Sequence, residues 1–139
     1  MKFQYAKIPT SDPRRQWISR PMLPIVVIHG ARSTAVSALI DSGADRSLFH
    51  VSIGDEIEIP REAGEEEVFG GIEGGVVRAE LHRVKIEIVG MEGAVEFVAG
   101  FTGAPGVSAI LGQDGFFDQY RIKFEKDHDA FEVTPVRKK

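Results

Sequence analysis

The chain contains no cysteine among its 139 residues, and this absence excludes several kinds of chemistry at once. Disulfide bridges, thiolate metal sites and a cysteine nucleophile all require a sulfur atom that the chain lacks. The histidines are scattered, with no two at the spacing that places a pair of ligands on one helix face. They are His29, His50, His82 and His128. We therefore expect no bound metal ion.

Long apolar runs and an excess of positive charge are missing as well. No stretch reaches the roughly 18 consecutive apolar residues of a membrane-spanning helix, and residues 1–20 lack the apolar segment of a secretory signal. The net charge is -4, so the chain has no basic field for nucleic acid or an anionic membrane surface. The sequence predicts a cytoplasmic protein with no nucleic-acid or membrane partner. The Gly-x-Ser-x-Gly motif of serine hydrolases is also absent.

What the chain does contain is glycine and proline, which divide it into short segments in which apolar and polar residues alternate. Alternation with a period of two is typical of strands that have one buried face. With 42% hydrophobic residues, the chain is long enough to bury the core of one domain. The sequence predicts a single domain that is mostly β. We expect strands at residues 24–29, 36–40, 84–88 and 95–101.

The last part of the chain is expected to form a β-hairpin over residues 122–134. Ile122 and Phe124 are answered there by Phe131 and Val133, with a polar turn between them. Such a hairpin would extend the sheet structure close to the C-terminus.

One short helix is expected over residues 114–120, about two turns long. Gly112 stands just before this segment, and Asp114 is placed to favour the N-terminus of the helix. Residues 52–67 are rich in acids and are expected to form a solvated excursion. The Glu65–Glu67 run within them is interpreted as a charged surface loop.

The segment Leu-Ile-Asp-Ser-Gly-Ala-Asp-Arg-Ser-Leu-Phe, residues 39–49, places a carboxylate at the end of an apolar strand. Burial of Asp41 is costly unless hydrogen bonds offset the loss of hydration. Ser42 and the amides around Gly43 can supply these bonds. The plain alternative is that Asp-Ser-Gly only ends the strand with a turn.

A second segment, residues 68–77, is rich in glycine (Val-Phe-Gly-Gly-Ile-Glu-Gly-Gly-Val-Val). A phosphate-binding loop needs a following helix and usually a Lys-Ser or Lys-Thr pair, and neither is present. The residues after Gly75 alternate between apolar and polar, so the loop is predicted to be the tip of a β-hairpin. It could be an ordinary hairpin or a moving cover over a groove.

A third segment, Ala109 to Gly115, is an apolar strand that reaches Gly112 and then opens the short helix. Together and in this order, the three segments resemble the retropepsin family, the retroviral-type aspartic proteases, and more specifically a cellular or bacterial member. The Asp41–Asp45 stretch resembles the catalytic motif of the family, the glycine-rich segment is similar to its flap, and Ile110-Leu111-Gly112 resembles its aliphatic-aliphatic-glycine signature. The likeness covers roughly residues 17–122.

This resemblance implies an all-β fold, a small closed barrel-like acid-protease fold with one short C-terminal helix, a flap hairpin and a homodimer. It also suggests how the chain divides. Residues 1–16 form an N-terminal extension that could supply an interface strand, residues 17–136 form the protease domain, and residues 137–139 form a basic tail.

The resemblance further implies an aspartic endopeptidase that hydrolyses peptide bonds in a peptide or protein substrate. Such an enzyme needs two carboxylates that share one proton, and the chain offers only one motif of this kind. Asp41 from each of two subunits would therefore form the dyad. Ser42 and Gly43 complete the catalytic motif. Water is the nucleophile, so no cofactor is expected. Because Ala44 lacks a hydroxyl, we expect activity at mildly acid pH.

Other residues take roles by the same resemblance. Arg20 is expected to reach Asp45 across the dimer, and Gln113 stands where retroviral members usually carry arginine. Terminal strands build much of the interface in the family, so Phe131–Val133 or Phe3–Ile8 are expected to do so here. The residues expected to bind substrate are Ala44, Asp45, Phe69, Gly70, Gly71, Ile72, Glu73 and Gly74. Those expected to support the site or interface are Arg20, Ile110, Leu111, Gly112 and Gln113.

A different class of function remains open. The chain could be a peptide-binding module that keeps the groove but does not cut, either as a monomer or as an inactive dimer.

Overall fold

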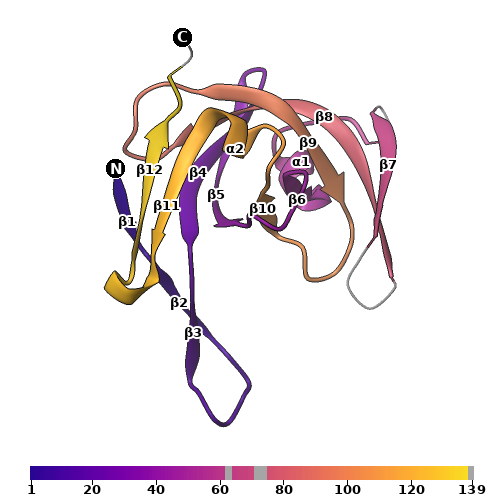
Figure 1. The fold of residues 1–139 in the computed structure, drawn as a ribbon. Helices are drawn as coiled ribbons and strands as arrows, with labels where there is room; N and C mark the ends of the chain where they lie inside the picture. Colours follow the sequence, from indigo (N-terminus) through magenta and orange to yellow (C-terminus); the bar gives the residue numbers. More distant parts are fainter. Residues whose placement is uncertain (62–63, 71–74, 138–139) are drawn as a thin grey trace.

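A computed structural model describes residues 1–61, 64–70 and 75–137 of the chain (Figure 1). The described residues are mostly β, with short helices between strands. The strands are β1 (Lys2–Gln4), β2 (Ala6–Pro9), β3 (Trp17–Arg20), β4 (Met22–His29), β5 (Arg32–Ile40), β6 (Leu48–His50), β7 (Glu65–Gly70), β8 (Val76–Ile88), β9 (Val95–Thr102), β10 (Ala109–Leu111), β11 (Tyr120–Glu125) and β12 (Ala130–Pro135). The helices are α1 (Val51–Glu56), α2 (Phe116–Gln119) and the 3-10 helix η2 (Lys126–His128).

The largest sheet closes into a barrel. Its strand order is β4-β5-β10-β6-β9-β8-β7, and a further pairing between β4 and β8 joins the ends of the ring. Closure is possible because β8 is long enough to pair with three strands: with β7 at its start, β9 in its middle and β4 at its end. Strand β7 therefore lies outside the ring. The predicted closed, barrel-like β fold is confirmed.

Alternation along the strands fills this barrel. In β4 the side chains of Leu23, Ile25 and Val27 are fully buried, each separated from the next by a less buried residue. The same period of two appears near the end of β8, where Val84, Ile86 and Ile88 point inward. One continuous apolar cluster joins these side chains to those of the other barrel strands, both α-helices and the C-terminal hairpin. Hence the part of the chain that the structure describes packs around a single core.

The predicted strands are present, with some longer than expected. The turn after β4 contains only Gly30 and Ala31, and Gly30 has a positive φ of +57°. Strand β5 consequently starts at Arg32, four residues before the predicted 36–40 strand. The first residues of β5 are polar and exposed, so the alternation of apolar and polar residues that indicates a strand is not visible there in the sequence. The hairpin of β8 and β9, with its turn around Gly90 and Gly93, agrees with the prediction.

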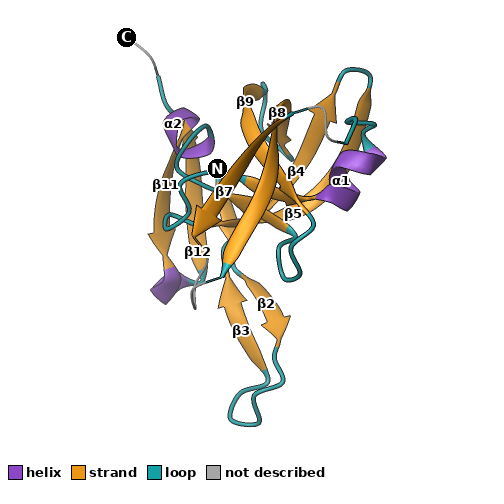
Figure 2. Ribbon diagram, turned by 90° about the vertical axis from the view of Figure 1, so that its right-hand side faces the viewer, coloured by secondary structure: helices purple, strands orange, loops and turns teal. Residues whose placement is uncertain are grey.

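The expectation of a solvated excursion over residues 52–67 is wrong. Val51–Glu56 forms helix α1, and the side chains of Ile53, Ile57 and Ile59 are buried in the core. The acids between them face solvent, and it is their number that conceals three apolar anchors in the sequence. Glu65–Glu67 is also not a loop, because these residues belong to strand β7. In Figure 2, α1 lies on the outer side of the barrel.

The C-terminal hairpin forms in the expected place. Ile122 pairs with Val133 and Phe124 with Phe131, across a turn made by η2. Strand β1 pairs with the other edge of β12, and the Phe3 ring stacks on Phe131 with centroids 5.5 Å apart. Since β12 has a neighbour on each side, its main chain has no free edge for a second copy. The expectation that Phe131–Val133 or Phe3–Ile8 contributes to an interface between copies stays a prediction.

Helix α2 is shorter than predicted. It covers Phe116–Gln119 instead of residues 114–120, because Tyr120 already pairs with Pro135 as the first residue of β11. Gly115 precedes the helix with a φ of +93°, and a Cβ there would lie only 2.5 Å from the Phe97 ring. With α1, the described residues contain two short α-helices where one was expected. Among the described helices, none has the length and apolar character needed to cross a membrane.

Strands β2 and β3 form a separate two-stranded sheet. In Figures 1 and 2 this hairpin extends away from the barrel, below the body of the molecule. Thr10 and Gln16 close the loop at its end through a backbone hydrogen bond of 3.2 Å.

Candidate active site

Asp41 directly follows β5, at the point where the chain leaves the barrel wall. Strand β10 runs parallel to β5, with Leu111 opposite Ile40. The Asp41 amide continues this ladder by donating to the Leu111 carbonyl at 3.0 Å. The backbone of Asp41 is thus fixed by the sheet while its side chain is only half-buried. This places a positioned carboxylate at the surface of the barrel.

The turn after Asp41 holds the carboxylate in place. The Gly43 amide donates to Asp41 Oδ1 at 2.9 Å, and the Ala44 amide donates to the Asp41 carbonyl at 3.2 Å. The predicted bond from an amide at Gly43 is confirmed. The Ser42 hydroxyl makes no such bond within the described chain, because it faces solvent. Its expected place in the catalytic motif stays a prediction.

The segment after β10 clamps the acid-bearing loop, residues 41–47. The Gln113 amide donates to the Ala44 carbonyl at 2.8 Å, and the Asp114 amide donates to the Asp45 carbonyl at 2.7 Å. The Gly112 amide donates to the buried Ser47 hydroxyl at 3.0 Å. The structure therefore brings the segment around Gly112 against the loop that carries Asp41.

Gly112 has no room for a side chain. A Cβ at this position would lie 2.7 Å from the carbonyl oxygens of Ala44 and Arg46. Both of these are backbone atoms of the acid-bearing loop, so they cannot rotate away as a side chain could. Gly112 is thus the residue that lets β10 approach the loop closely.

The Gln113 side chain adds a contact that the sequence does not reveal. Its Nε2 donates to the Ser42 carbonyl at 2.8 Å. The sequence predicts only that Gln113 supports the site or the interface. In the structure the amide braces the loop at Ser42, one residue after Asp41. No pattern in the sequence indicates this bond, because the two residues are 71 positions apart.

A hairpin extends beside this loop. We call β7 and the paired first part of β8 the flap strands. Phe69 pairs with Val77, and both border a hollow of about 240 Å³ next to the acid-bearing loop. Its lining residues are Gly43, Ala44, Asp45, Arg46, Leu48, Phe69 and Val77.

The predicted substrate-binding residues are only partly described. Phe69, Ala44 and Asp45 lie together at this hollow, and Gly70 is the last residue of β7. The remaining predicted residues, Gly71, Ile72, Glu73 and Gly74, lie outside the described residues.

An ion pair between Arg46 and Glu67 connects the flap strands to the acid-bearing loop. Arg46 Nε and Nη2 donate to the two carboxylate oxygens of Glu67, each at 3.1 Å. The exposed fractions of the two side chains are 20% and 34%, so the pair is partly shielded from water. Sequence analysis missed both residues. One sequence signal could have drawn attention to Glu67: the alternation of β7 places it on the same face as Phe69.

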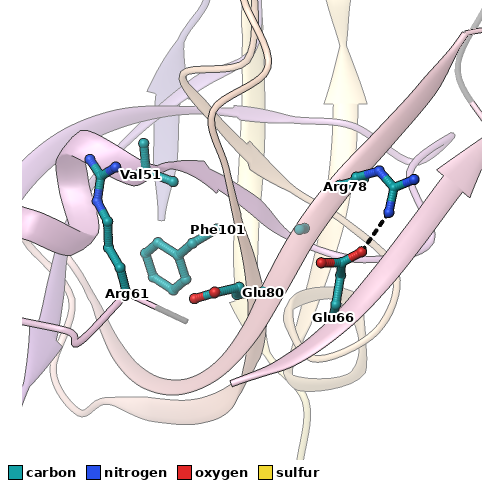
Figure 3. Close-up of a pocket in the computed structure, with 7 residues that line it drawn as sticks. Val51, Arg61, Glu66, Arg78, Glu80 and Phe101 are labelled. Atoms are coloured by element: carbon teal, nitrogen blue, oxygen red, sulfur yellow. Dashed lines mark hydrogen bonds and ion pairs between the residues drawn. The ribbon is translucent and has the colours of Figure 1, made fainter. Parts of the chain in front are cut away.

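A second hollow, of about 210 Å³, lies on the opposite face of the flap strands. Figure 3 shows Arg61, Glu66, Arg78 and Glu80 around it, with the Phe101 ring at its base. Its charged groups are already engaged: Arg78 with Glu66 at 2.7 Å, Arg61 with Asp55 at 2.7 Å, and Glu80 with His82 at 3.3 Å. The Arg61 guanidinium holds the pKa of Asp55 below its usual value. We place the candidate active site at the first hollow, because the loop that carries Asp41 lines it through Gly43 and Ala44.

Arg20 and Asp45 do not meet within the chain. Both are exposed, Arg20 Nη1 donates to the Ser19 carbonyl at 3.0 Å, and the described residues offer Asp45 no ion-pair partner. Their pairing across a dimer stays a prediction. In the described ranges no three His, Asp or Glu side chains are grouped as metal ligands would be.

Alone, this arrangement can hold one carboxylate but cannot complete acid-base chemistry. A base that activates water needs an acid on the other side of the reacting carbonyl. No second carboxylate bonds to Asp41 within the described chain, and Asp45 and Asp114 are joined to each other through their backbones, on the clamp. Within the described chain the site therefore presents a single positioned carboxylate.

Comparison with known proteins gives a likeness in structure only. No protein-family model matches the chain, and no curated protein matches it. Among solved structures, the chain is similar to an EIAV protease complexed with the inhibitor HBY-793. The TM-score is 0.47 and the sequence identity 19%, over 75% of this chain and 88% of that chain.

Proposed function

We propose that the chain is an aspartic endopeptidase in which Asp41 from each of two copies forms the catalytic dyad. The observation that carries the proposal is the geometry around Asp41. Its carboxylate is half-buried, accepts a bond from the Gly43 amide, and stands on a loop clamped by β10 beside the hollow of the flap strands. A carboxylate that only ended a strand would not need a second strand to fix its loop.

The proposed reaction follows from two carboxylates that share one proton. At close range the two cannot both be ionised, so one is a base while the other is an acid. The base takes a proton from water as the water oxygen bonds to the peptide carbonyl carbon. The acid gives its proton to the carbonyl oxygen. The C–N bond of this tetrahedral intermediate then breaks: the dyad gives its proton to the amine nitrogen and takes one from a hydroxyl of the intermediate as the C=O bond forms again. The products are an amine and a carboxylic acid, and the dyad again holds one proton.

Symmetry supplies the second carboxylate. The chain has one Asp-Ser-Gly motif, and a two-fold axis beside it would bring the same residue from a second copy to the opposite side of the substrate. The partly exposed Asp41 and the exposed Ser42 and Gly43 are compatible with this, because they leave the loop open on one side. The dimer is thus a condition of the proposed chemistry.

The substrate would be an extended peptide between the acid-bearing loop and the flap strands. Extended peptides bind by main-chain hydrogen bonds, and pockets for alternate side chains give specificity. Leu48, Phe69 and Val77 give the hollow apolar walls, and of its two charged lining residues, Asp45 and Arg46, the second is paired with Glu67. We therefore expect cleavage beside hydrophobic residues.

The test is the Asp41→Asn variant, assayed against an unstructured protein between pH 4 and 6. Loss of the base and acid should lower kcat/KM by at least about a thousandfold. Asp127→Asn is the control, because this exposed aspartate lies in the turn between β11 and β12. It should cleave as the unchanged protein does.

Two results would overturn the proposal. Cleavage that persists in Asp41→Asn would show that another group or a contaminant performs the reaction. A folded dimer that binds peptides but never cleaves them would show the alternative, a peptide-binding module.

A further inference from the structure

The β2–β3 hairpin is isolated in this structure. Its strands pair only with each other in the described part of the chain, and the hairpin extends beyond the barrel (Figures 1 and 2). A two-stranded hairpin is marginally stable in water unless something packs on it. Its apolar residues should therefore find a partner surface.

Both faces of the hairpin carry apolar groups. Ile8 and Ile18 pair on one face and border a hollow of about 220 Å³, whose far wall includes Leu39 and Ile110. On the other face the Trp17 side chain is 47% exposed. Large aromatic side chains with this exposure are typical of contact surfaces between proteins.

The hollow adjoins the face that a dimer must use. Leu39 and Ile110 pair with each other, two residues before Asp41 and Gly112 respectively. If two copies of Asp41 are to share a proton, the second copy must approach this end of β5 and β10. A hairpin that extends from the same region would then lie along the second copy.

Charge favours the same partner. Residues 6–20 contain four cationic residues, Lys7, Arg14, Arg15 and Arg20, and one acid, Asp12, whereas the whole chain has a net charge of -4. Asp12 is within 3.2 Å of Arg14 and 3.9 Å of Arg15. Neither Lys7 nor Arg20 has an ion-pair partner within the described residues; the Lys7 ammonium lies 5.0 Å from the Trp17 ring centroid. The hairpin is thus basic, while the rest of the chain is acidic.

We propose that the β2–β3 hairpin is a dimerisation arm that packs against a second copy of this chain. Its Trp17 and its arginines contact the acidic body of that copy near the segment that follows β10. Ile8 and Ile18 pack the arm against its own barrel. The proposal rests on the proposed function, because the dyad requires the dimer. It places the interface on the arm and not on the β1-β12-β11 sheet.

The experiment measures the dimer dissociation constant by sedimentation at several protein concentrations. Trp17→Ser, and separately Arg14→Glu combined with Arg15→Glu, should each raise the constant at least tenfold. Arg14 and Arg15 are highly exposed, so reversing their charge should leave the circular dichroism spectrum unchanged. Arg121→Glu combined with Lys123→Glu is the matched control, since it makes the same change of charge on exposed residues of β11. It should stay within twofold of the unchanged protein.

The outcomes separate this proposal from the proposed function. If the unchanged protein dimerises and both arm variants dimerise equally well, the proposed dimerisation arm is wrong, while the proposed Asp41 dyad is unaffected. If the arm variants are monomeric but the unchanged dimer cleaves no peptide, the arm is supported and the protease function is overturned. A protein that stays monomeric at every concentration overturns both.

Discussion

Single residues carry much of the candidate site, and Gly112 is the most constrained of them. Its absent side chain is what allows the loop after β10 to bond to Ala44 and to Ser47. We expect Gly112→Ala to lower the free energy of unfolding by about 1–3 kcal/mol, because the added methyl meets two backbone carbonyls at 2.7 Å. Urea denaturation would measure this loss, and peptide cleavage should fall with it.

Gly103→Ala is the matched control for that substitution. Gly103 lacks a positive φ, and nothing lies within 4 Å of a Cβ built there. The change should leave stability within about 0.5 kcal/mol of the unchanged protein, or raise it slightly. Equal losses for the two alanine variants would refute the close-packing argument at Gly112.

Tyr120 gives a residue-scale prediction about alkaline pH. Burial raises the pKa of its phenol above the usual value of 10.0. Above pH 10 the unfolded chain therefore loses this proton more readily than the folded chain does. The free energy of unfolding should then decrease as the pH rises from the pKa of Tyr120 in the unfolded chain toward its higher pKa in the folded chain. Tyr120→Phe should reduce this alkaline loss, measured by urea denaturation between pH 8 and 11.

A second tyrosine sharpens that measurement. Burial, followed by the charge of Asp129, also raises the pKa of Tyr5. The double variant Tyr5→Phe and Tyr120→Phe contains no tyrosine and should show the smallest alkaline loss of all. An identical pH profile in the single variant, the double variant and the unchanged protein would contradict the assignment.

At the scale of elements, the flap strands are joined to the acid-bearing loop by Arg46 and Glu67. The pair is two-pronged and partly shielded, so a double-mutant cycle should give a coupling free energy of about 1 kcal/mol. We expect Glu67→Gln to raise KM more than it lowers kcat, because the hollow beside Asp41 loses the contact that shapes it. Steady-state kinetics on one peptide would separate the two effects.

The neighbouring Glu66 provides the control for this link. It lies on the opposite face of β7 and pairs with Arg78 at 2.7 Å, where both side chains are more than half exposed. Glu66→Gln removes the same charge one residue away and should leave KM unchanged. If both variants alter KM equally, overall charge is responsible and the Arg46 link is not.

Elements also show where sequence reasoning succeeds. The pairing of Ile122 and Phe124 with Val133 and Phe131 was accessible because alternation and a polar turn are both local signals. Helix α1 was missed for the opposite reason. Ile53 of the helix, and Ile57 and Ile59 just after it, are buried but stand among acids, and their burial depends on barrel strands that are distant in the sequence.

At the scale of the whole molecule, the proposed dyad makes activity a property of pairs of chains. A subunit that lacks the carboxylate should therefore inactivate an intact partner. Mixing equal amounts of Asp41→Asn and unchanged protein, above the dissociation constant, should reduce activity to about half by random pairing. Cleavage rates measured after overnight exchange would test this.

The same mixture with an inert protein of similar size in place of the variant is the control. It should leave the rate unchanged, which excludes dilution and surface adsorption. If the Asp41→Asn subunit has no effect although sedimentation shows mixed dimers, one carboxylate is sufficient and the shared-proton mechanism is wrong.

The sequence by itself determined the strand-rich class, the register of the C-terminal hairpin and the position of Asp41 at the end of a strand. These rest on local patterns: alternation, turns, and a carboxylate followed by glycine. Only the tertiary structure decided that Gln113 braces Ser42, that Arg46 binds Glu67, and that the β2–β3 hairpin stands apart from the barrel. Each of these joins or separates residues far apart in the chain, and such contacts depend on how the strands close into a barrel, which no local pattern specifies.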